Sequence, residues 1–189
     1  MSNEVQRIGY QPLYPIDRSF LGQVVIRPVR QDDLPALEWE GEYTHFRRLY
    51  SEIFQNTTKG EALMWTADLP GMGLIGQLFV QLKSARKELA DGQSRAYIYG
   101  FRVKPSFRGV GVGSRLLYAA EGDLAQRKFR WISLNVGRQN HDALRFYKRC
   151  GYQVVAAEPG RWSYQDEQGR RQEVHEPAWR MEKRIHPSV

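Results

Sequence analysis

Arg108-Gly109-Val110-Gly111-Val112-Gly113-Ser114 decides the fold of this chain, because it joins a strand-like segment to a helix-like one. The apolar run of residues 97–103 precedes it, and residues 112–127 follow it. Glycine has no Cβ, so a glycine-rich backbone can approach a ligand closely. Successive backbone N–H groups at a helix N-terminus attract anions. The stretch therefore predicts a turn that binds a pyrophosphate.

Three kinds of phosphate-binding turn have to be distinguished. The mononucleotide P-loop ends in Gly-Lys-Ser/Thr, whereas here Gly113 is followed by Ser-Arg. The dinucleotide fingerprint G-x-G-x-x-G also fails, because Ser114 and Leu116 stand where its third glycine would be. The remaining pattern is R-x-x-G-x-G, formed by Arg108, Gly111 and Gly113. A glycine-rich turn that binds no ligand stays open as the alternative.

Two further motifs carry a resemblance to a known family. Residues 140–152 read NHDALRFYKRCGY and match N-x-x-A-x-x-x-Y-x-x-x-G-[FY] at Asn140, Ala143, Tyr147 and Gly151-Tyr152. Residues 103–109, VKPSFRG, match V-x-P-x-[YF]-R-G. With the glycine turn, these motifs resemble the GNAT (general-control-related N-acetyltransferase) superfamily, in order and in spacing. They cover about a third of the chain, and the order of elements extends the resemblance over residues 24–185.

The resemblance implies an α/β (α+β) fold: a single-domain GNAT fold with a mixed, mostly antiparallel sheet of about seven strands and about four helices. The expected domain spans residues 23–186, after an N-terminal extension of residues 1–22. Three consecutive strands precede the helix of residues 112–127, which is unlike an alternating doubly wound fold. Predicted strands are residues 24–29, 62–67, 73–83, 95–103, 131–136 and 152–156, with residues 162–165 paired to 173–183. A first helix is predicted to start near residue 34, with Asp32 or Asp33 as its cap. Three further helices are predicted over residues 46–54, 112–127 and 142–149.

Composition limits the class of protein. A chain of 189 residues favours one domain. No apolar run approaches 18 residues, and the N-terminus lacks the pattern of a secretory signal. The single cysteine, Cys150, excludes an internal disulfide, fits a cytoplasmic location, and is expected to be a buried structural thiol.

The formal net charge of +7 comes from scattered basic residues without a nucleic-acid-binding signature. A coenzyme with several phosphates uses part of this charge, so nucleic acid is kept only as a remote alternative partner. His45, His141, His175 and His186 show no metal-ligand spacing, and we predict no metal.

The resemblance implies acetyl-CoA (coenzyme A) as co-substrate. The backbone of Phe101, Arg102 and Val103 would then meet the pantetheine arm like an added strand. The pyrophosphate would be held by N–H groups of the turn, from Gly109, Val110, Gly111, Val112, Gly113 and Ser114. Arg108 would add a charged contact or simply face solvent. Asn140 would contact the pantetheine or its loop, cap the helix that follows, or do both.

Tyr147 is the predicted catalytic residue. Acyl transfer to an amine expels a thiolate, and a phenol can donate a hydrogen bond to the departing sulfur. The alternative is a core tyrosine on an amphipathic helix. By resemblance, a backbone N–H near Val103 polarises the thioester carbonyl, and the amine attacks directly in a ternary complex.

No general base can be assigned from the sequence. Many family members carry a glutamate in the fourth strand, where this chain has Tyr97 and Tyr99, or an acid in the fifth, where it has Asn135. Glu61, Asp68 and Glu121 are other candidate bases, and no motif supports them. The alternatives are a water relay past the two tyrosines, or an amine of lower pKa such as a peptide α-amino group near ~7.7–8.0.

The acceptor is expected between the early helices and the late hairpin. Aromatic and basic residues there form a candidate wall for an amine, or are ordinary core and rim residues: Tyr43, Phe46, Arg47, Tyr50, Trp65, Trp162 and Tyr164. The predicted function is an acyl-CoA-dependent N-acetyltransferase acting on a primary amine of a protein, peptide or small molecule. The alternatives are a non-catalytic acyl-CoA-binding module and, remotely, a nucleic-acid-binding protein. Residues 1–22 could also serve a homodimer contact.

Overall fold

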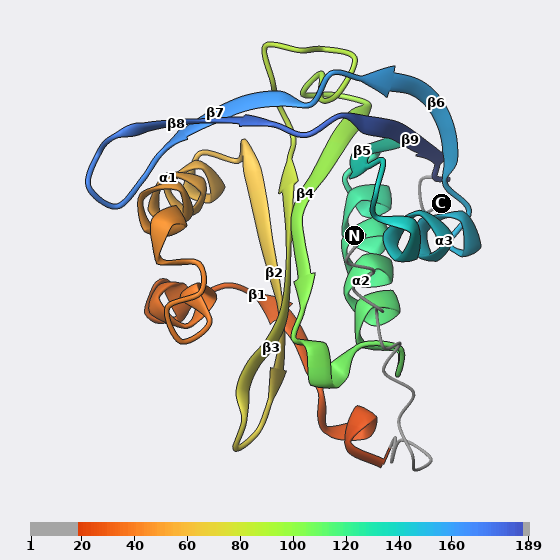
Figure 1. Ribbon diagram of the computed structural model, residues 1–189. Helices are drawn as coiled ribbons and strands as arrows, with labels where there is room; N and C mark the ends of the chain where they lie inside the picture. The colour runs from red at the N-terminus through yellow and green to blue at the C-terminus, as the bar shows by residue number, and fades with distance from the viewer. Residues whose placement is uncertain (1–18, 187–189) are drawn as a thin grey trace, which may run out of the picture.

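The structure, a computed structural model, describes residues 19–186. Most of the expected N-terminal extension of residues 1–22 lies outside the described residues, and its end forms the short 3-10 helix Ser19–Gln23. The main sheet has seven strands in the order β1-β2-β3-β4-β5-β9-β6 (Figure 1). Only the pair β4–β5 is parallel, which confirms the expected mixed, mostly antiparallel sheet. The strands are β1 (Val25–Pro28), β2 (Ala62–Leu69), β3 (Gly73–Gln81), β4 (Arg95–Val103), β5 (Trp131–Gly137), β6 (Gln153–Glu158) and β9 (Ala178–Arg184).

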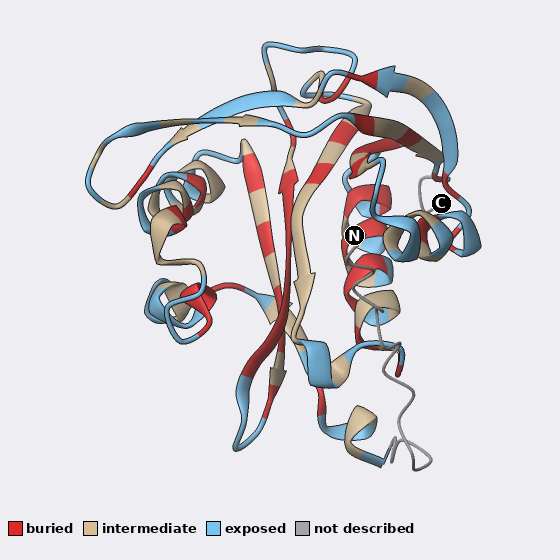
Figure 2. Ribbon diagram, in the orientation of Figure 1, coloured by how far each residue is buried: buried red, intermediate tan, exposed pale blue. Residues whose placement is uncertain are grey.

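Helices cover both faces of this sheet. Helix α1 (Arg47–Thr58) lies on one face, and α2 (Val112–Gln126) and α3 (His141–Arg149) lie on the other (Figure 1). The hydrophobic core lies between the sheet and the helices on each face. Figure 2 shows buried residues along β3 and on the sheet-facing side of α2. None of the helices within residues 19–186 is long and apolar enough to cross a membrane.

The first expected helix, near residue 34, is a 3-10 helix, Gln31–Glu38, rather than an α-helix. Pro35 lies inside it and has no backbone N–H to offer to an α-helical ladder. Asp33 closes its first turn, because its carboxylate accepts a hydrogen bond from the backbone N–H of Arg30 at 2.7 Å. Two further 3-10 turns, Thr44–Phe46 and Pro105–Phe107, precede α1 and α2.

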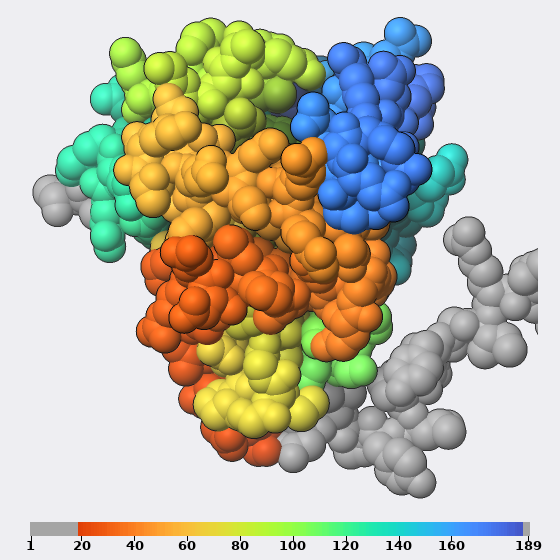
Figure 3. Space-filling view, turned by 90° about the vertical axis from the view of Figure 1, so that its left-hand side faces the viewer, coloured from red at the N-terminus to blue at the C-terminus, as the bar shows by residue number. Residues whose placement is uncertain are grey.

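The predicted late hairpin is present, but its second strand is shorter than predicted. Strands β7 (Arg161–Gln165) and β8 (Arg171–His175) pair only with each other. The predicted strand of residues 173–183 is broken at Glu176-Pro177, because proline cannot donate to a strand ladder. After this break, β9 joins β5 and β6 in the main sheet. The β7–β8 hairpin leans on α1 (Figure 3), where the Tyr164 and Phe46 ring centres are 4.8 Å apart.

A bulge in β4 opens the sheet at its centre. Gln77 pairs with Arg102 and Phe79 with Tyr99, so two residues of β4 face one residue of β3. Gly100 lies in the bulge with φ +58°, and a Cβ there would stand 2.6 Å from the Phe79 ring. Pairing of β4 with β5 ends at Ile98. The end of β4, residues 99–103, therefore has one edge without a strand partner.

Candidate functional site

The glycine turn has the backbone conformation that its sequence predicted. Gly109 and Gly111 have φ angles of +74° and +111°, which favour glycine. Gly111 is the N-cap of α2, and the N–H of Arg115 is the first to bond back to it, at 3.1 Å. The N–H groups of residues 112–114 therefore lack carbonyl partners within the helix, which makes this end suitable for an anion.

A groove of about 860 Å³ runs from this turn along the free edge of β4 to α3; we call it the α2 groove. It brings together nearly all the residues predicted to bind the coenzyme: Phe101, Arg102, Val103, Arg108, Gly109, Val110, Gly111, Gly113, Ser114, Asn140 and Tyr147. Val112 does not line it, because its side chain is fully buried against the sheet. For Val112 only a backbone contact remains as a prediction.

Two predicted residues of the α2 groove have structural partners. Arg108 donates from Nε to the carbonyl oxygen of Val103 at 2.8 Å, which ties the glycine turn to the end of β4. Asn140 caps α3, since its Oδ1 accepts from the N–H of Ala143 at 3.1 Å. The helix-cap alternative for Asn140 is thus confirmed, and its contact with a coenzyme stays a prediction.

Tyr147 lies in α3 with its ring buried among aromatic neighbours. The ring centres of Phe101, Phe146 and Tyr152 are 6.2, 5.2 and 5.6 Å away. Burial raises the pKa of the Tyr147 phenol well above its usual range, so the group stays neutral. Within residues 19–186 its hydroxyl has no hydrogen-bond partner, although the residue lines the groove. A neutral phenol at this place is available as a donor.

A second space, which we call the aromatic cavity, has about 380 Å³. Three residues of the predicted acceptor wall line it, namely Phe46, Tyr50 and Trp162. The other four do not line it: Tyr43, Trp65 and Tyr164 pack against the core, and Arg47 is exposed and paired with Glu38. Arg102, next to the bulge of β4, lines both the aromatic cavity and the α2 groove. The two spaces therefore meet where β4 leaves β5.

The three acids considered as bases lie outside both spaces. Glu61 is half-exposed, and Asp68 accepts from Arg27 at 2.8 Å. Glu121 accepts from the Tyr152 hydroxyl at 2.9 Å and from Lys183 at 2.7 Å. The carboxylates of Asp68 and Glu121 thus stabilise the scaffold.

One buried carboxylate of the aromatic cavity was missed by the sequence reasoning. Glu158 ends β6, and both of its oxygens accept from Arg86 at 3.0 Å. Arg180 lies 3.4 Å from the same carboxylate. A signal existed, because Glu158 precedes the breaker pair Pro159-Gly160 at a strand end, but its partners are distant in sequence. As arranged, it is a neutralised carboxylate rather than a free base.

Tyr97 and Tyr99 of β4 both line the aromatic cavity. Burial raises the pKa of Tyr97 to about 12 and moves that of Tyr99 upward as well. Asn135 also lines it, and its buried Oδ1 has no hydrogen-bond partner within residues 19–186. These groups can orient water, but the phenols would be poor proton acceptors at neutral pH.

Other reactive groups are accounted for. Cys150 is buried in the core, as expected, and burial raises the pKa of its thiol. Within the described part of the chain, no group of three or more His, Cys, Asp or Glu side chains is placed to hold a metal ion.

Comparison with known proteins identifies the family. The model of the acetyltransferase (GNAT) family matches residues 26–152, which is more than half of the chain. This chain belongs to the GNAT acetyltransferase family. An uncharacterized N-acetyltransferase of Methanocaldococcus jannaschii is 40% identical over 58 residues, which are 31% of this chain and 26% of that protein. The chain thus matches about a quarter of that relative's length.

Solved structures have the same fold as this GNAT chain. Ard1 from Thermoplasma volcanium has a TM-score of 0.66 at 20% identity, covering 86% of this chain and 98% of that one. Arabidopsis thaliana NAA60 in complex with acetyl-CoA has a TM-score of 0.62 at 24% identity, covering 86% and 98%. The expected fold class is therefore confirmed.

Proposed function

We propose that this GNAT acetyltransferase transfers an acetyl group from acetyl-CoA to a primary amine by direct attack in a ternary complex. One observation carries the proposal: the α2 groove and the aromatic cavity meet at Arg102, beside the free edge of β4. Two substrates bound in these spaces would have their reacting groups side by side. The only cysteine, Cys150, lines neither space, which argues against a covalent acyl-thiol route.

The α2 groove has donors suited to acetyl-CoA. The N–H groups of residues 109–114 would hold the pyrophosphate, and the unpaired edge of residues 101–103 would pair with the pantetheine amides like a strand. A backbone N–H near Val103 would polarise the thioester carbonyl. These contacts use the backbone, so the side chains of Val110 and Val112 are free to remain in the core.

Tyr147 would donate a hydrogen bond to the departing sulfur. A thiol has a pKa near ~8.5, whereas burial lifts the pKa of this phenol above its usual value of ~10. Complete proton transfer to the thiolate would therefore be uphill. A hydrogen bond that strengthens as charge develops on sulfur is the role that fits, and the proton of the thiol would come from solvent.

The proton of the attacking amine would leave through water. Glu158 is the carboxylate of the aromatic cavity, and two guanidinium groups already occupy it. Tyr97, Tyr99 and Asn135 surround the same space and can order water molecules there. The lack of a free carboxylate is also the observation that favours the second candidate function, a non-catalytic acyl-CoA-binding module. A cytoplasmic location and a homodimer remain sequence predictions.

Calorimetry with acetyl-CoA, followed by a free-thiol assay against pooled amines, separates the two functions. Binding with thiol release in one pool supports the transferase, and binding without release in any pool supports the binding module. Gly111→Ala, at φ +111°, should weaken acetyl-CoA binding at least tenfold. Gly71→Ala is the matched control, because Gly71 also has a positive φ, of +80°, but lies in the remote β2–β3 turn. Equal loss in both variants would contradict the assignment of the glycine turn.

A further inference from the structure

Arg102 is a half-buried guanidinium at the junction of the two spaces, and it has no carboxylate partner within residues 19–186. Its Nη1 donates to the Tyr50 hydroxyl at 3.2 Å. Its Cζ lies 4.1 Å from the centre of the Tyr43 ring and 5.2 Å from that of Phe46. The rings hold the guanidinium in place, while most of its five N–H groups remain unused.

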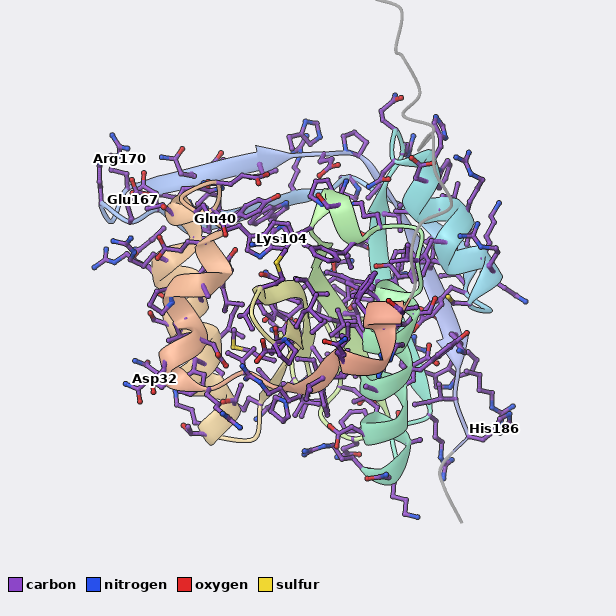
Figure 4. All side chains as sticks on the ribbon, turned by 90° about the horizontal axis from the view of Figure 1, so that it is seen from below. Asp32, Glu40, Lys104, Glu167, Arg170 and His186 are labelled. Atoms are coloured by element: carbon purple, nitrogen blue, oxygen red, sulfur yellow. The ribbon has the colours of Figure 1, made fainter. Side chains whose placement is uncertain are left out.

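Two of the nearby acids are bound to other cations, and a third, Glu42, is hydrogen-bonded to Tyr43. Glu38 accepts from Arg47 at 2.6 Å, and Glu40 pairs with Lys104 at 2.7 Å. Figure 4 labels the second pair, whose side chains lie next to each other just beyond the end of β4. Glu38 at the end of the 3-10 helix is thus balanced by Arg47, and Glu40 after it by Lys104. Arg102 is left as a cation without a carboxylate partner among residues 19–186.

The aromatic cavity as a whole carries excess positive charge. Its lining includes Arg86, Arg102, Arg161 and a single acid, Glu158. Arg86 is already paired with Glu158 and with Glu88, at 3.0 and 2.7 Å. The structure gives Arg161, like Arg102, no carboxylate partner among the described residues. A polycationic acceptor would be repelled here, and an anionic group would be attracted.

We propose that the acceptor is a primary amine that also carries a carboxylate on a small apolar or aromatic body, and that Arg102 binds this carboxylate. The inference rests on the proposed function and names its substrate class. A planar guanidinium presents two parallel N–H donors that match a carboxylate. Aromatic rings from α1, β4 and β7 would cover the apolar body, and about 380 Å³ is at the small end for ligand sites. Both a free amino acid and a peptide N-terminus followed by an acidic residue have this chemistry.

Matched acceptors test the charge directly. The thiol-release assay compares L-phenylalanine with its amide, a Ser-Glu peptide with a Ser-Gln peptide, and both pairs with spermidine. We expect kcat/KM to be at least tenfold higher for the anionic member of the preferred pair, and spermidine to be the poorest substrate. Preference within the first pair identifies a free amino acid, and within the second a peptide. A neutral member that reacts equally well, or spermidine as the best acceptor, would overturn the proposal.

Variants assign the effect to Arg102. Arg102→Gln should bring the ratio within the preferred pair close to one, and Arg102→Lys should restore part of it. Arg171→Gln is the matched control, because Arg171 is 71% exposed on β8 and lines neither space. Thermal unfolding checks that each variant folds. If Arg102→Gln leaves the ratio unchanged, or instead lowers acetyl-CoA affinity tenfold, Arg102 does not bind the acceptor.

A binding measurement tests the carboxylate site at Arg102 separately from acetyl transfer. N-acetyl-L-phenylalanine and its amide are titrated into the protein in the presence of CoA. If no amine releases thiol, the transferase proposal fails. The site for the carboxylate is then judged by this titration alone: tighter binding of the acid, lost in Arg102→Gln, supports it, and equal binding of acid and amide overturns it.

Discussion

Replacing Tyr147 with phenylalanine removes one hydroxyl and leaves the ring that packs in the aromatic cluster. A hydrogen bond to a charged group contributes about 1.5–3 kcal/mol. If the phenol donates to the departing thiolate, that loss falls on the transition state, and at ~1.36 kcal/mol per tenfold it lowers kcat about 10- to 150-fold. Steady-state thiol release with saturating acetyl-CoA and the best acceptor measures this directly.

The surroundings of Tyr147 allow the hydroxyl to be removed without breaking another interaction among residues 19–186. Its hydroxyl has no hydrogen-bond partner in residues 19–186, so the variant leaves no buried group unsatisfied there. Acetyl-CoA affinity by calorimetry should change less than about threefold, because the proposed coenzyme contacts are from the backbone. Tyr118→Phe is the matched control, since Tyr118 is 56% exposed on α2 and lines neither space. A kcat for Tyr147→Phe within about threefold of the wild type would refute the reasoning.

Three further outcomes follow from the fold and its charges. Gly100→Ala should destabilise the protein by roughly 1–3 kcal/mol in denaturant unfolding, because φ is +58° and a Cβ would meet the Phe79 ring at 2.6 Å. Burial of Asp91 acts to raise the pKa of its carboxyl, but backbone N–H donors of residues 93–95 outweigh burial and hold the pKa well below its usual range. The stability lost in Asp91→Asn should therefore be fully seen above about pH 4 and should shrink as the pH falls below it, in unfolding measured across pH. Arg102→Gln should move the acid limb of the kcat–pH profile to higher pH by on the order of one unit, because the bound acceptor's carboxylate would no longer be neutralised and would stabilise the ammonium form of its amine.

The parts of the site that are local in sequence were predictable. Alternating glycines after an apolar strand predicted the turn, and the structure has left-handed φ angles at Gly109 and Gly111. The pattern of residues 142–149 predicted a helix with Asn140 as one candidate cap, and the family resemblance implied that Tyr147 lies at the coenzyme site. The structure has the capped helix, and Tyr147 lines the α2 groove. In these segments a few adjacent residues determine the backbone, so no distant partner is needed to infer it.

The parts that depend on distant partners were not predictable. Glu158 is neutralised by Arg86, 72 residues earlier in the chain, so its role could not be inferred from its neighbours. The bulge at Gly100 had a signal, an isolated glycine inside a strand, but its consequence depends on the Phe79 ring of the adjacent strand. The break between β8 and β9 likewise had a signal in Pro177, and the pairing of β9 with β5 and β6 decides where the strand goes.

The missing base and the excess positive charge have a common explanation in the aromatic cavity. An amine with a pKa near ~10.4 needs about 4–5 kcal/mol to lose its proton at pH 7. A carboxylate is one solution to this cost, and a cationic surrounding is another, because like charge lowers the pKa of an ammonium group. Here Arg86 and Glu158 cancel, whereas Arg102 and Arg161 do not. In such a cavity Arg102 would pair with the carboxylate of an acceptor, and the remaining positive charge of Arg161 would disfavour the protonated form of its amine. On this proposal, water ordered by Tyr97, Tyr99 and Asn135 would carry the proton away without a carboxylate base.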